Sequence, residues 1–118
     1  AYAMAACYSA DADGTIELPF DSATGELRPD TWARWLAWDP VRVARTDAGR
    51  AALRSLRAIY IDAGTHDEYH LDLGAEAFRR ACVEAGSIAP SFELFEAGHG
   101  GIEYRYPIAL RYLAEHLG

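Results

Sequence analysis

The sequence predicts an α/β fold in which parallel strands are flanked by helices, and three observations in its second half predict it. Residues 58–63 form a nearly continuous apolar run, which is typical of a strand buried in a parallel sheet. Residues 71–85 repeat apolar side chains at helical spacing, and residues 91–96 form a second short strand. A last helix is predicted over residues 104–117, and this order of elements indicates parallel strands joined by a right-handed helical crossover. We therefore expect residues 58–118 to be the strand-helix-strand-helix end of the sheet.

Residues 1–57 predict a loop-rich and helical excursion ahead of these strands. Residues 3–8 form a short apolar run that fits a strand. Residues 11–26 are rich in Asp, Gly, Ser, Thr and Pro, which indicates a long irregular loop. A loop of that length is usually functional or belongs to an excursion from the sheet.

Two helices are expected within this excursion. The first spans residues 29–39, between a proline that favours a helix start and an Asp-Pro pair that ends the helix. One face of this helix carries an apolar stripe formed by Trp32, Trp35 and Leu36. Trp38 lies off that stripe. The second helix is short and is capped by Asp47. Its predicted apolar side consists of Ala51, Ala52 and Leu56.

The elements of the second half are predicted to bury one side each. For residues 71–85 the buried side is Leu71, Ala75, Phe78, Cys82 and Ala85. Gly86 is the expected stop of that helix. In the second strand, Phe92 and Leu94 face one side. For residues 104–117 the buried side is Tyr106, Ala109, Leu110, Leu113 and Leu117.

Charge and cysteine content exclude several partner classes. The formal net charge is −7, and all eleven basic residues are arginine, so no positive face for nucleic acid or an anionic membrane is expected. The apolar start at residues 1–7 has no basic region and is too short to cross a bilayer. Cys7 and Cys82 form no C-x-x-C pair, and we expect two reduced, buried thiols in a cytoplasmic protein, with a disulfide left open.

An acid and a histidine follow the two predicted strands. Asp67 comes just past the glycine turn after the first strand, and His99 lies between two glycines after the second. The carboxyl ends of parallel strands meet at one edge of a sheet, so these two loops can touch. A histidine can take a proton from a hydroxyl and return it to a leaving group, provided that a carboxylate fixes its tautomer. We predict His99 as general base and acid, and Asp67 as its orienting carboxylate.

Other roles for these residues stay open at this point. Asp62 and Glu68 are rivals of Asp67 by spacing, although Asp62 is expected to be committed to the turn at the strand end. In a purely structural interpretation, His99 caps the last helix and Asp67 caps the helix that follows it.

No metal or cofactor is expected. His66 and His70 are four residues apart, but the glycine turn places His66 in a loop and no third ligand follows at a suitable spacing. A solvated helix start explains them better. The sequence also contains no glycine-rich phosphate loop and no dinucleotide fingerprint.

The tryptophans suggest a pocket for an acyl or aromatic group. Packing on the core accounts for Trp32 and Trp35, so Trp38 is the candidate substrate-binding residue.

No nucleophile is apparent in the chain. Five serines are present, at Ser9, Ser22, Ser55, Ser87 and Ser91. None lies in a G-x-S-x-G elbow, and neither cysteine has such a frame.

Two motifs carry a resemblance to a known family. The segment Asp62-Ala63-Gly64-Thr65-His66-Asp67-Glu68-Tyr69 is similar to a D-x-G-x-x-D-[QE]-[FY] motif, and Gly98-His99 is followed by a helix that opens with tyrosines. In these features residues 59–117 resemble the carboxyl-terminal part of esterase D-like α/β-hydrolases. That group includes S-formylglutathione hydrolases and enterochelin-esterase-like enzymes. Residues 18–43 look like the segment between strands six and seven of such esterases.

The resemblance implies a serine esterase whose triad acid is Asp67 and whose triad histidine is His99. It implies that the chain is a fragment, the carboxyl-terminal part of an α/β-hydrolase fold, with the nucleophile serine and oxyanion hole before residue 1. The expected substrate is a small-molecule ester or thioester, and the expected partner is the amino-terminal part of the fold or a separate chain. The isolated chain would then be inactive. The alternative is a non-catalytic α/β module that acts by packing or by self-association as a homo-oligomer.

Overall fold

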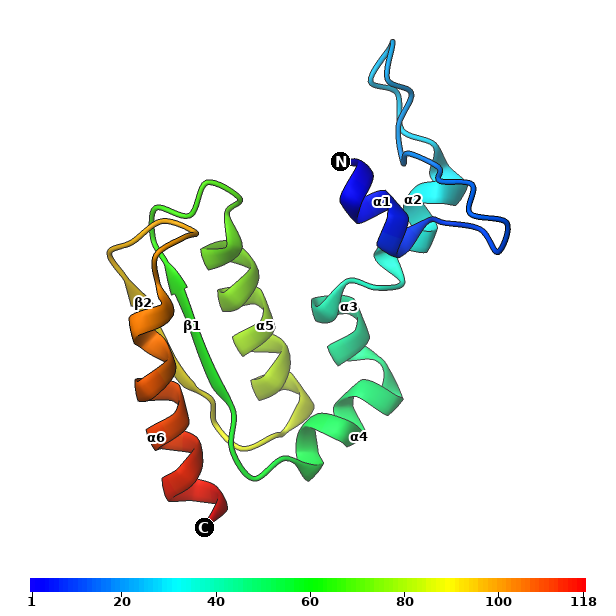
Figure 1. Ribbon diagram of the computed structural model, residues 1–118. Coiled ribbons are helices and arrows are strands. Elements are labelled where there is room, and N and C mark those ends of the chain that lie inside the picture. The colour runs from blue at the N-terminus through cyan, green and yellow to red at the C-terminus, as the bar shows by residue number, and fades with distance from the viewer. The chain divides into compact units, whose positions relative to one another are not determined.

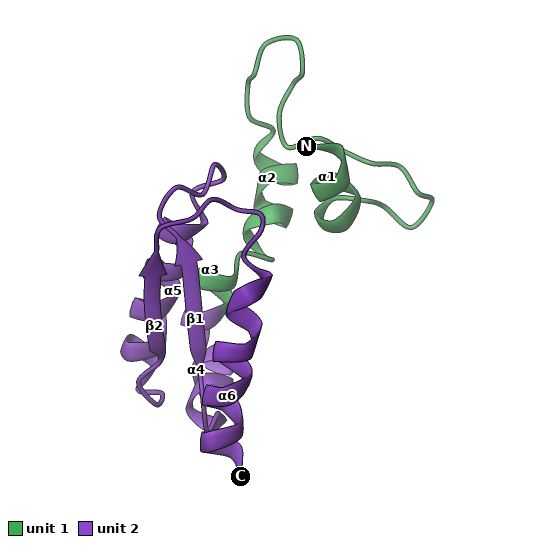
Figure 2. Ribbon diagram, turned by 60° about the vertical axis from the view of Figure 1, so that its left-hand side comes forward, with its two compact units in different colours: residues 1–43 green, residues 44–118 purple.

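The computed structural model describes residues 1–118, which divide into two compact units, residues 1–43 and 44–118 (Figure 2). The elements in chain order are α1 (Tyr2–Tyr8), α2 (Pro29–Leu36), α3 (Pro40–Arg45), α4 (Asp47–Ser55), β1 (Tyr60–Gly64), α5 (Leu71–Ala85), β2 (Ser91–Phe95), the 3₁₀ helix η1 (Glu103–Arg105) and α6 (Tyr106–Leu117) (Figure 1). The boundary between the units lies earlier than the division predicted at residue 57, because Ala44 and Leu53 pack into the core of the second unit. No helix is both long and apolar enough to cross a membrane.

The second unit contains a parallel pair of strands, which confirms the predicted α/β class. β1 pairs with β2 in a register that sets Tyr60 opposite Ser91 and Gly64 opposite Phe95. The crossover between the strands is α5, as the sequence predicts. The two strands point the same way, and the loops that follow them lie at the same end of the unit (Figures 1 and 2).

Side chains of β1 alternate between two helical layers. Ile59 and Ile61 pack in the core cluster with residues of α4 and α5. Tyr60 and Asp62 contact the opposite layer, where the Tyr60 ring lies 5.7 Å from that of Tyr112 and Asp62 binds Arg105. Successive side chains of a strand point to opposite faces, so α5 and α6 cover opposite faces of the strand pair.

Helix α5 has the predicted bounds, and Gly86 ends it with a left-handed φ of 72°. Glycine adopts this conformation without strain, and the following backbone N–H groups turn back to the last helical carbonyls. Cys82 and Ala85 are buried, as predicted, whereas Leu71 at the first turn is 49 % exposed. Ala81, which was not predicted, is buried as well. Burial raises the pKa of the Cys82 thiol.

The predicted buried side of the last helix is wrong for three of its five residues. Helix α6 starts at Tyr106, after a separate 3₁₀ turn, and contains no fully buried residue. Tyr106, Leu110 and Leu117 are 66, 65 and 50 % exposed. Helical spacing determines which residues share a face, but burial also needs a neighbour, and the two-stranded sheet covers only part of this helix.

In the first unit, residues 3–8 form part of helix α1 and not the predicted strand. Three of these six residues are alanine, the strongest helix former, and a short apolar run does not by itself distinguish a strand from a helix. The predicted irregular loop at residues 11–26 is confirmed apart from two isolated bridges, Ala10 with Ile16 and Phe20 with Leu27.

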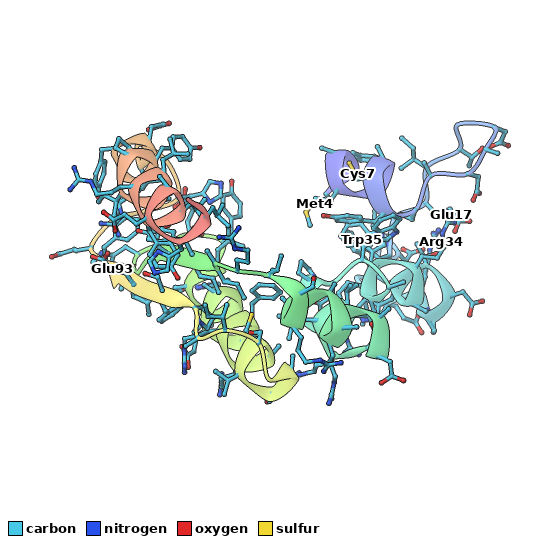
Figure 3. The ribbon with its side chains drawn as sticks, turned by 90° about the horizontal axis from the view of Figure 1, so that it is seen from below. Met4, Cys7, Glu17, Arg34, Trp35 and Glu93 are labelled. Atoms are coloured by element: carbon cyan, nitrogen blue, oxygen red, sulfur yellow. The ribbon has the colours of Figure 1, made fainter.

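Both cysteines are free thiols, but only one has the predicted burial. Cys82 is fully buried, whereas Cys7 is exposed on α1 (Figure 3). Helix α1 buries only Ala5, so Cys7 lies outside its packed face.

The helices around residue 40 differ from the expectation. Helix α2 begins at Pro29 as predicted but ends at Leu36, and α3 begins at Pro40, where no helix was predicted. Asp39 separates them, and its carboxylate accepts the Val41 N–H at 2.9 Å. The Asp-Pro pair therefore starts α3, whereas α2 ends three residues before it.

Helix α4 is capped by Thr46 and not by Asp47, since the Thr46 hydroxyl accepts the Gly49 N–H at 3.0 Å. Its buried residue is Leu53, while the predicted Ala51, Ala52 and Leu56 are exposed. Leu53 packs in the core cluster with residues of α5, and this tertiary contact selects the buried face of α4.

Candidate active site

The loops after β1 and β2 are held together by backbone contacts. The Thr65 N–H donates to the Phe95 carbonyl at 2.9 Å, and the His66 N–H donates to the Ala97 carbonyl at 3.0 Å. Gly64 makes this approach possible, because a Cβ atom there would collide with the Ala97 carbonyl oxygen and lie 2.7 Å from that of Gly98. The two loops that carry Asp67 and His99 therefore lie against each other.

The Asp67 carboxylate is buried and contacts the His99 ring. Its Oδ2 lies 3.1 Å from His99 Nδ1, and its Oδ1 accepts the Tyr69 N–H at 2.7 Å. Burial acts to raise the pKa of Asp67, but the hydrogen bonds from Tyr69, His99 and the Leu71 N–H together outweigh it and hold that pKa below its ordinary value. The carboxylate is therefore ionised at neutral pH.

His99 has one engaged side and one open side. Its side chain is 48 % exposed, against 5 % for Asp67. The edge-to-face contact with the Tyr69 ring, at 4.9 Å and 77°, restrains the imidazole further. Asp67 faces Nδ1, and no protein group hydrogen-bonds to Nε2. A carboxylate on Nδ1 and an open Nε2 are what a histidine needs to act as general base.

The rivals of Asp67 have other partners. Glu68 Oε2 accepts the backbone N–H of His99 at 3.1 Å and does not contact the ring nitrogens. We had expected Asp62 to be committed to the turn, and this expectation is wrong. Its carboxylate accepts hydrogen bonds from Arg105 Nε at 2.9 Å and from the Tyr60 hydroxyl at 3.0 Å. The strand alternation points Asp62 away from the loop and toward η1.

The purely structural interpretation, in which His99 and Asp67 cap helices, does not account for their positions. The residue that precedes α6 is Arg105, so His99 does not cap that helix. His70 precedes α5, with a φ of 57° and no side-chain cap. Asp67 has two roles, since it binds His99 and also accepts the Tyr69 N–H in the turn that leads into α5.

The two histidines of the suggested metal cluster are exposed in the turn before α5, and neither lies within the helix. No group of three or more His, Cys, Asp or Glu side chains is placed to bind a metal ion.

Trp38 lines a pocket of about 300 Å³ within the first unit. Trp32, Trp35 and Tyr8 line the same pocket. Trp35 is fixed from two sides, because its Nε1–H donates to Ser9 Oγ at 2.8 Å and the Tyr8 ring packs edge-on at 5.4 Å (Figure 3). Trp38 is 63 % exposed, so it is free to cover a bound group, and its substrate-binding role stays a prediction.

Sequence reasoning missed a polar network around Arg105, a residue that is only 9 % exposed. Arg105 donates to Asp62 and to the Tyr60 hydroxyl at 3.1 Å, forms an ion pair with Glu93 and lies 4.4 Å from the centre of the Phe95 ring. The hydrogen bonds to Glu93 and Asp62 raise the pKa of Arg105 above its ordinary value. The available signal was Asp62 inside an apolar strand, because a carboxylate at such a position needs a partner.

None of the five serines hydrogen-bonds to His99. Ser9 Oγ, for example, accepts the Trp35 N–H in the first unit, and Ser87 Oγ donates to the Cys82 carbonyl at 2.9 Å. The arrangement therefore contains an acid and a base without a serine hydrogen-bonded to them.

Neither a protein-family model nor a curated protein matches the chain. The resemblance to esterase D-like hydrolases therefore depends on its two motifs. The geometry of Asp67 and His99 is an independent observation from the structure.

Proposed function

We propose that this chain is the carboxyl-terminal part of an α/β-hydrolase and supplies the acid and the histidine of a serine esterase. The observation that carries the proposal is the 3.1 Å contact between Asp67 Oδ2 and His99 Nδ1 at the carboxyl ends of two parallel strands. Carboxyl ends of parallel strands are where α/β folds place their active sites. The order of acid and then histidine along the chain is also that of α/β-hydrolases.

In the proposed reaction His99 moves one proton at each step. Nε2 takes the proton of a serine hydroxyl as the serine oxygen attacks the carbonyl carbon of a small ester or thioester. The same proton passes to the departing alcohol or thiol when the carbonyl–heteroatom bond breaks. A water molecule then repeats the sequence on the acyl-enzyme. Asp67 keeps the Nδ1 proton in place and stabilises the imidazolium. The serine comes from outside this chain, and the mechanism uses no cofactor.

A second candidate, a non-catalytic α/β module, is favoured by the exposed face of α6. Tyr106 and Leu110 are two-thirds exposed there, and a sheet of two strands is smaller than most stable sheets. Such a unit gains stability by packing against the amino-terminal part of a fold or against a second copy.

Intact-mass spectrometry after treatment with a fluorophosphonate tests the first proposal. A mass shift on a second, co-purifying chain is the expected result, because the nucleophile is placed outside this chain. A shift on this chain would contradict that placement. No shift, with this chain the only species and oligomers that grow with concentration, would support the non-catalytic module.

Substitutions in the complete esterase then assign the roles. His99→Ala and Asp67→Asn are each expected to lower turnover by roughly 10⁴-fold without unfolding the protein. His116→Ala is the control, since His116 is exposed on α6 and its Nδ1 contacts the Tyr112 carbonyl at 2.7 Å. Normal turnover in both site variants would rule out the assignment.

A further inference from the structure

We infer that Glu68 is a positioning residue for His99, because its carboxylate holds the main chain of the histidine while Asp67 holds the ring. The inference deepens the proposed function and depends on it, since the orientation of His99 affects catalysis only if His99 is the base. Three consecutive residues, Asp67, Glu68 and Tyr69, would then share the task of fixing one histidine.

The three contacts act on different parts of His99. Asp67 Oδ2 lies 3.1 Å from Nδ1, and the Tyr69 ring packs edge-to-face against the imidazole at 4.9 Å. Glu68 Oε2 accepts the backbone N–H at 3.1 Å. Contacts to the ring restrain the side-chain torsions, whereas the contact to the N–H restrains the peptide that carries the side chain. Only Glu68 acts on the peptide.

The loop around His99 needs a restraint of this kind. Gly98 precedes the histidine and Gly100 and Gly101 follow it, and Gly101 has a left-handed φ of 72°. Glycine has more backbone freedom than any other residue, so a loop with three of them does not hold a fixed course by itself. His99 is half-exposed, and packing therefore contributes little to its position.

The surroundings of Glu68 suit the role. Hydrogen bonds from its own backbone N–H and from the His99 N–H lower the pKa of Glu68, so it is ionised and accepts a charge-assisted hydrogen bond. A Cβ atom on Gly98 would lie 3.4 Å from Glu68 Oε2, at the near limit of ordinary contact.

The test measures the solvent-exchange rate of the His99 backbone amide by NMR in the full 118-residue chain. Glu68→Ala removes the acceptor and is expected to raise this rate about fivefold or more. Glu68→Gln keeps an acceptor oxygen without the charge and is expected to restore slow exchange. Glu96→Ala is the matched control, because Glu96 is an exposed glutamate just after β2. The unfolding midpoint should change little in all three variants, since both glutamates are exposed.

Two results would overturn the inference. An unchanged His99 rate in Glu68→Ala would show that the carboxylate restrains nothing. A Glu68→Gln variant that exchanges as fast as Glu68→Ala would assign the effect to charge and not to the hydrogen bond.

The amide measurement needs no esterase activity, so its outcome is separate from fluorophosphonate labelling. A slow His99 amide without a labelled serine would contradict the esterase and leave the positioning contact intact. In a labelled esterase, Glu68→Ala should lower kcat about fivefold with KM unchanged, and Glu68→Gln should recover it. A change in KM alone would argue against positioning.

Discussion

One carboxylate in β1 and one just after it each pair with a basic side chain, and the two pairs differ in how far the polar atoms of the basic partner are hydrogen-bonded. Asp62 in β1 binds Arg105, whose side chain is 10 % exposed and whose guanidinium also contacts Glu93 and Tyr60. Asp67, three residues past β1, binds His99, whose side chain is 48 % exposed and whose Nε2 is open. The first pair is largely buried at the edge of a pocket of about 340 Å³, and each of its members has a charged partner. The second pair has a buried acid and an open base.

The difference separates a structural role from a chemical one. A guanidinium stays protonated at neutral pH, so the Asp62–Arg105 pair holds β1, β2 and η1 together without exchanging a proton. An imidazole with a fixed Nδ1 and a free Nε2 can exchange a proton with a third group. Substitutions in the two pairs should therefore affect different properties of the protein, which the following predictions use.

The largest effect on stability is expected from Arg105→Ala. It leaves Asp62, with a side chain only 16 % exposed, and the nearby Glu93 without their cation. Breaking a buried ion pair on one side costs roughly 3–5 kcal/mol of the free energy of unfolding. Urea titration of the full chain measures that loss. Arg111→Ala is the control, an exposed arginine on α6, with an expected change within about 0.5 kcal/mol. Equal losses in the two variants would mean that the Arg105 network contributes nothing.

A smaller loss in the free energy of unfolding, about 1–3 kcal/mol, is expected from Gly64→Ala. The added Cβ collides with the Ala97 carbonyl, so the loop that carries His99 has to move away from the turn that carries Asp67. Gly74→Ala is the control with the opposite sign, because nothing lies within 4 Å of a Cβ there and alanine favours the helix by about 1 kcal/mol. NMR signals of His99 should shift in the first variant only. A Gly64→Ala protein as stable as wild type would refute the close approach.

The contrast between the two pairs also shows what the sequence could predict. Strand β1, helix α5 and its stop at Gly86 follow from local periodicity, and they were predicted with almost their observed bounds. The meeting of Asp67 and His99 followed from one further rule, that parallel strands end at a common edge. The strand, the helix and its stop depend on neighbouring residues along the chain, whereas the meeting of two residues 32 positions apart needed a rule of sheet topology.

Features that depend on distant residues were missed. Arg105 lies 43 residues from Asp62, and no local pattern links them. The need for glycine at position 64 arises from the Ala97 carbonyl, and the exposure of Tyr106 arises from the layer that covers α6 only in part. At residues 3–8 the pattern was local but ambiguous, and alanine's helix propensity decided the outcome.

The smallest stability effect at neutral pH, and the sharpest test of the open pair, is expected from Asp67→Asn. The folded protein holds the pKa of Asp67 below its ordinary value of 3.8, so the ionised carboxylate stabilises the fold above that pH. This contribution disappears as the pH falls through the lowered pKa. The gap in unfolding free energy between wild type and Asp67→Asn should therefore be present at pH 7 and close below about pH 3.8.

His99→Ala refines this result, because it removes one hydrogen bond to Asp67 and leaves the one from the Tyr69 N–H. The His99→Ala variant should still lose part of the unfolding free energy that wild type loses on acidification, whereas Asp67→Asn should lose none of it. The asparagine amide can also donate to Nδ1, which would place the imidazole proton on Nε2 and leave no lone pair there to act as a base. Nitrogen-15 shifts of the His99 ring report that tautomer directly. An Nδ1-protonated ring in Asp67→Asn would mean that the carboxylate does not set the tautomer, and the argument for an orienting acid would fail even if the pH dependence were as expected.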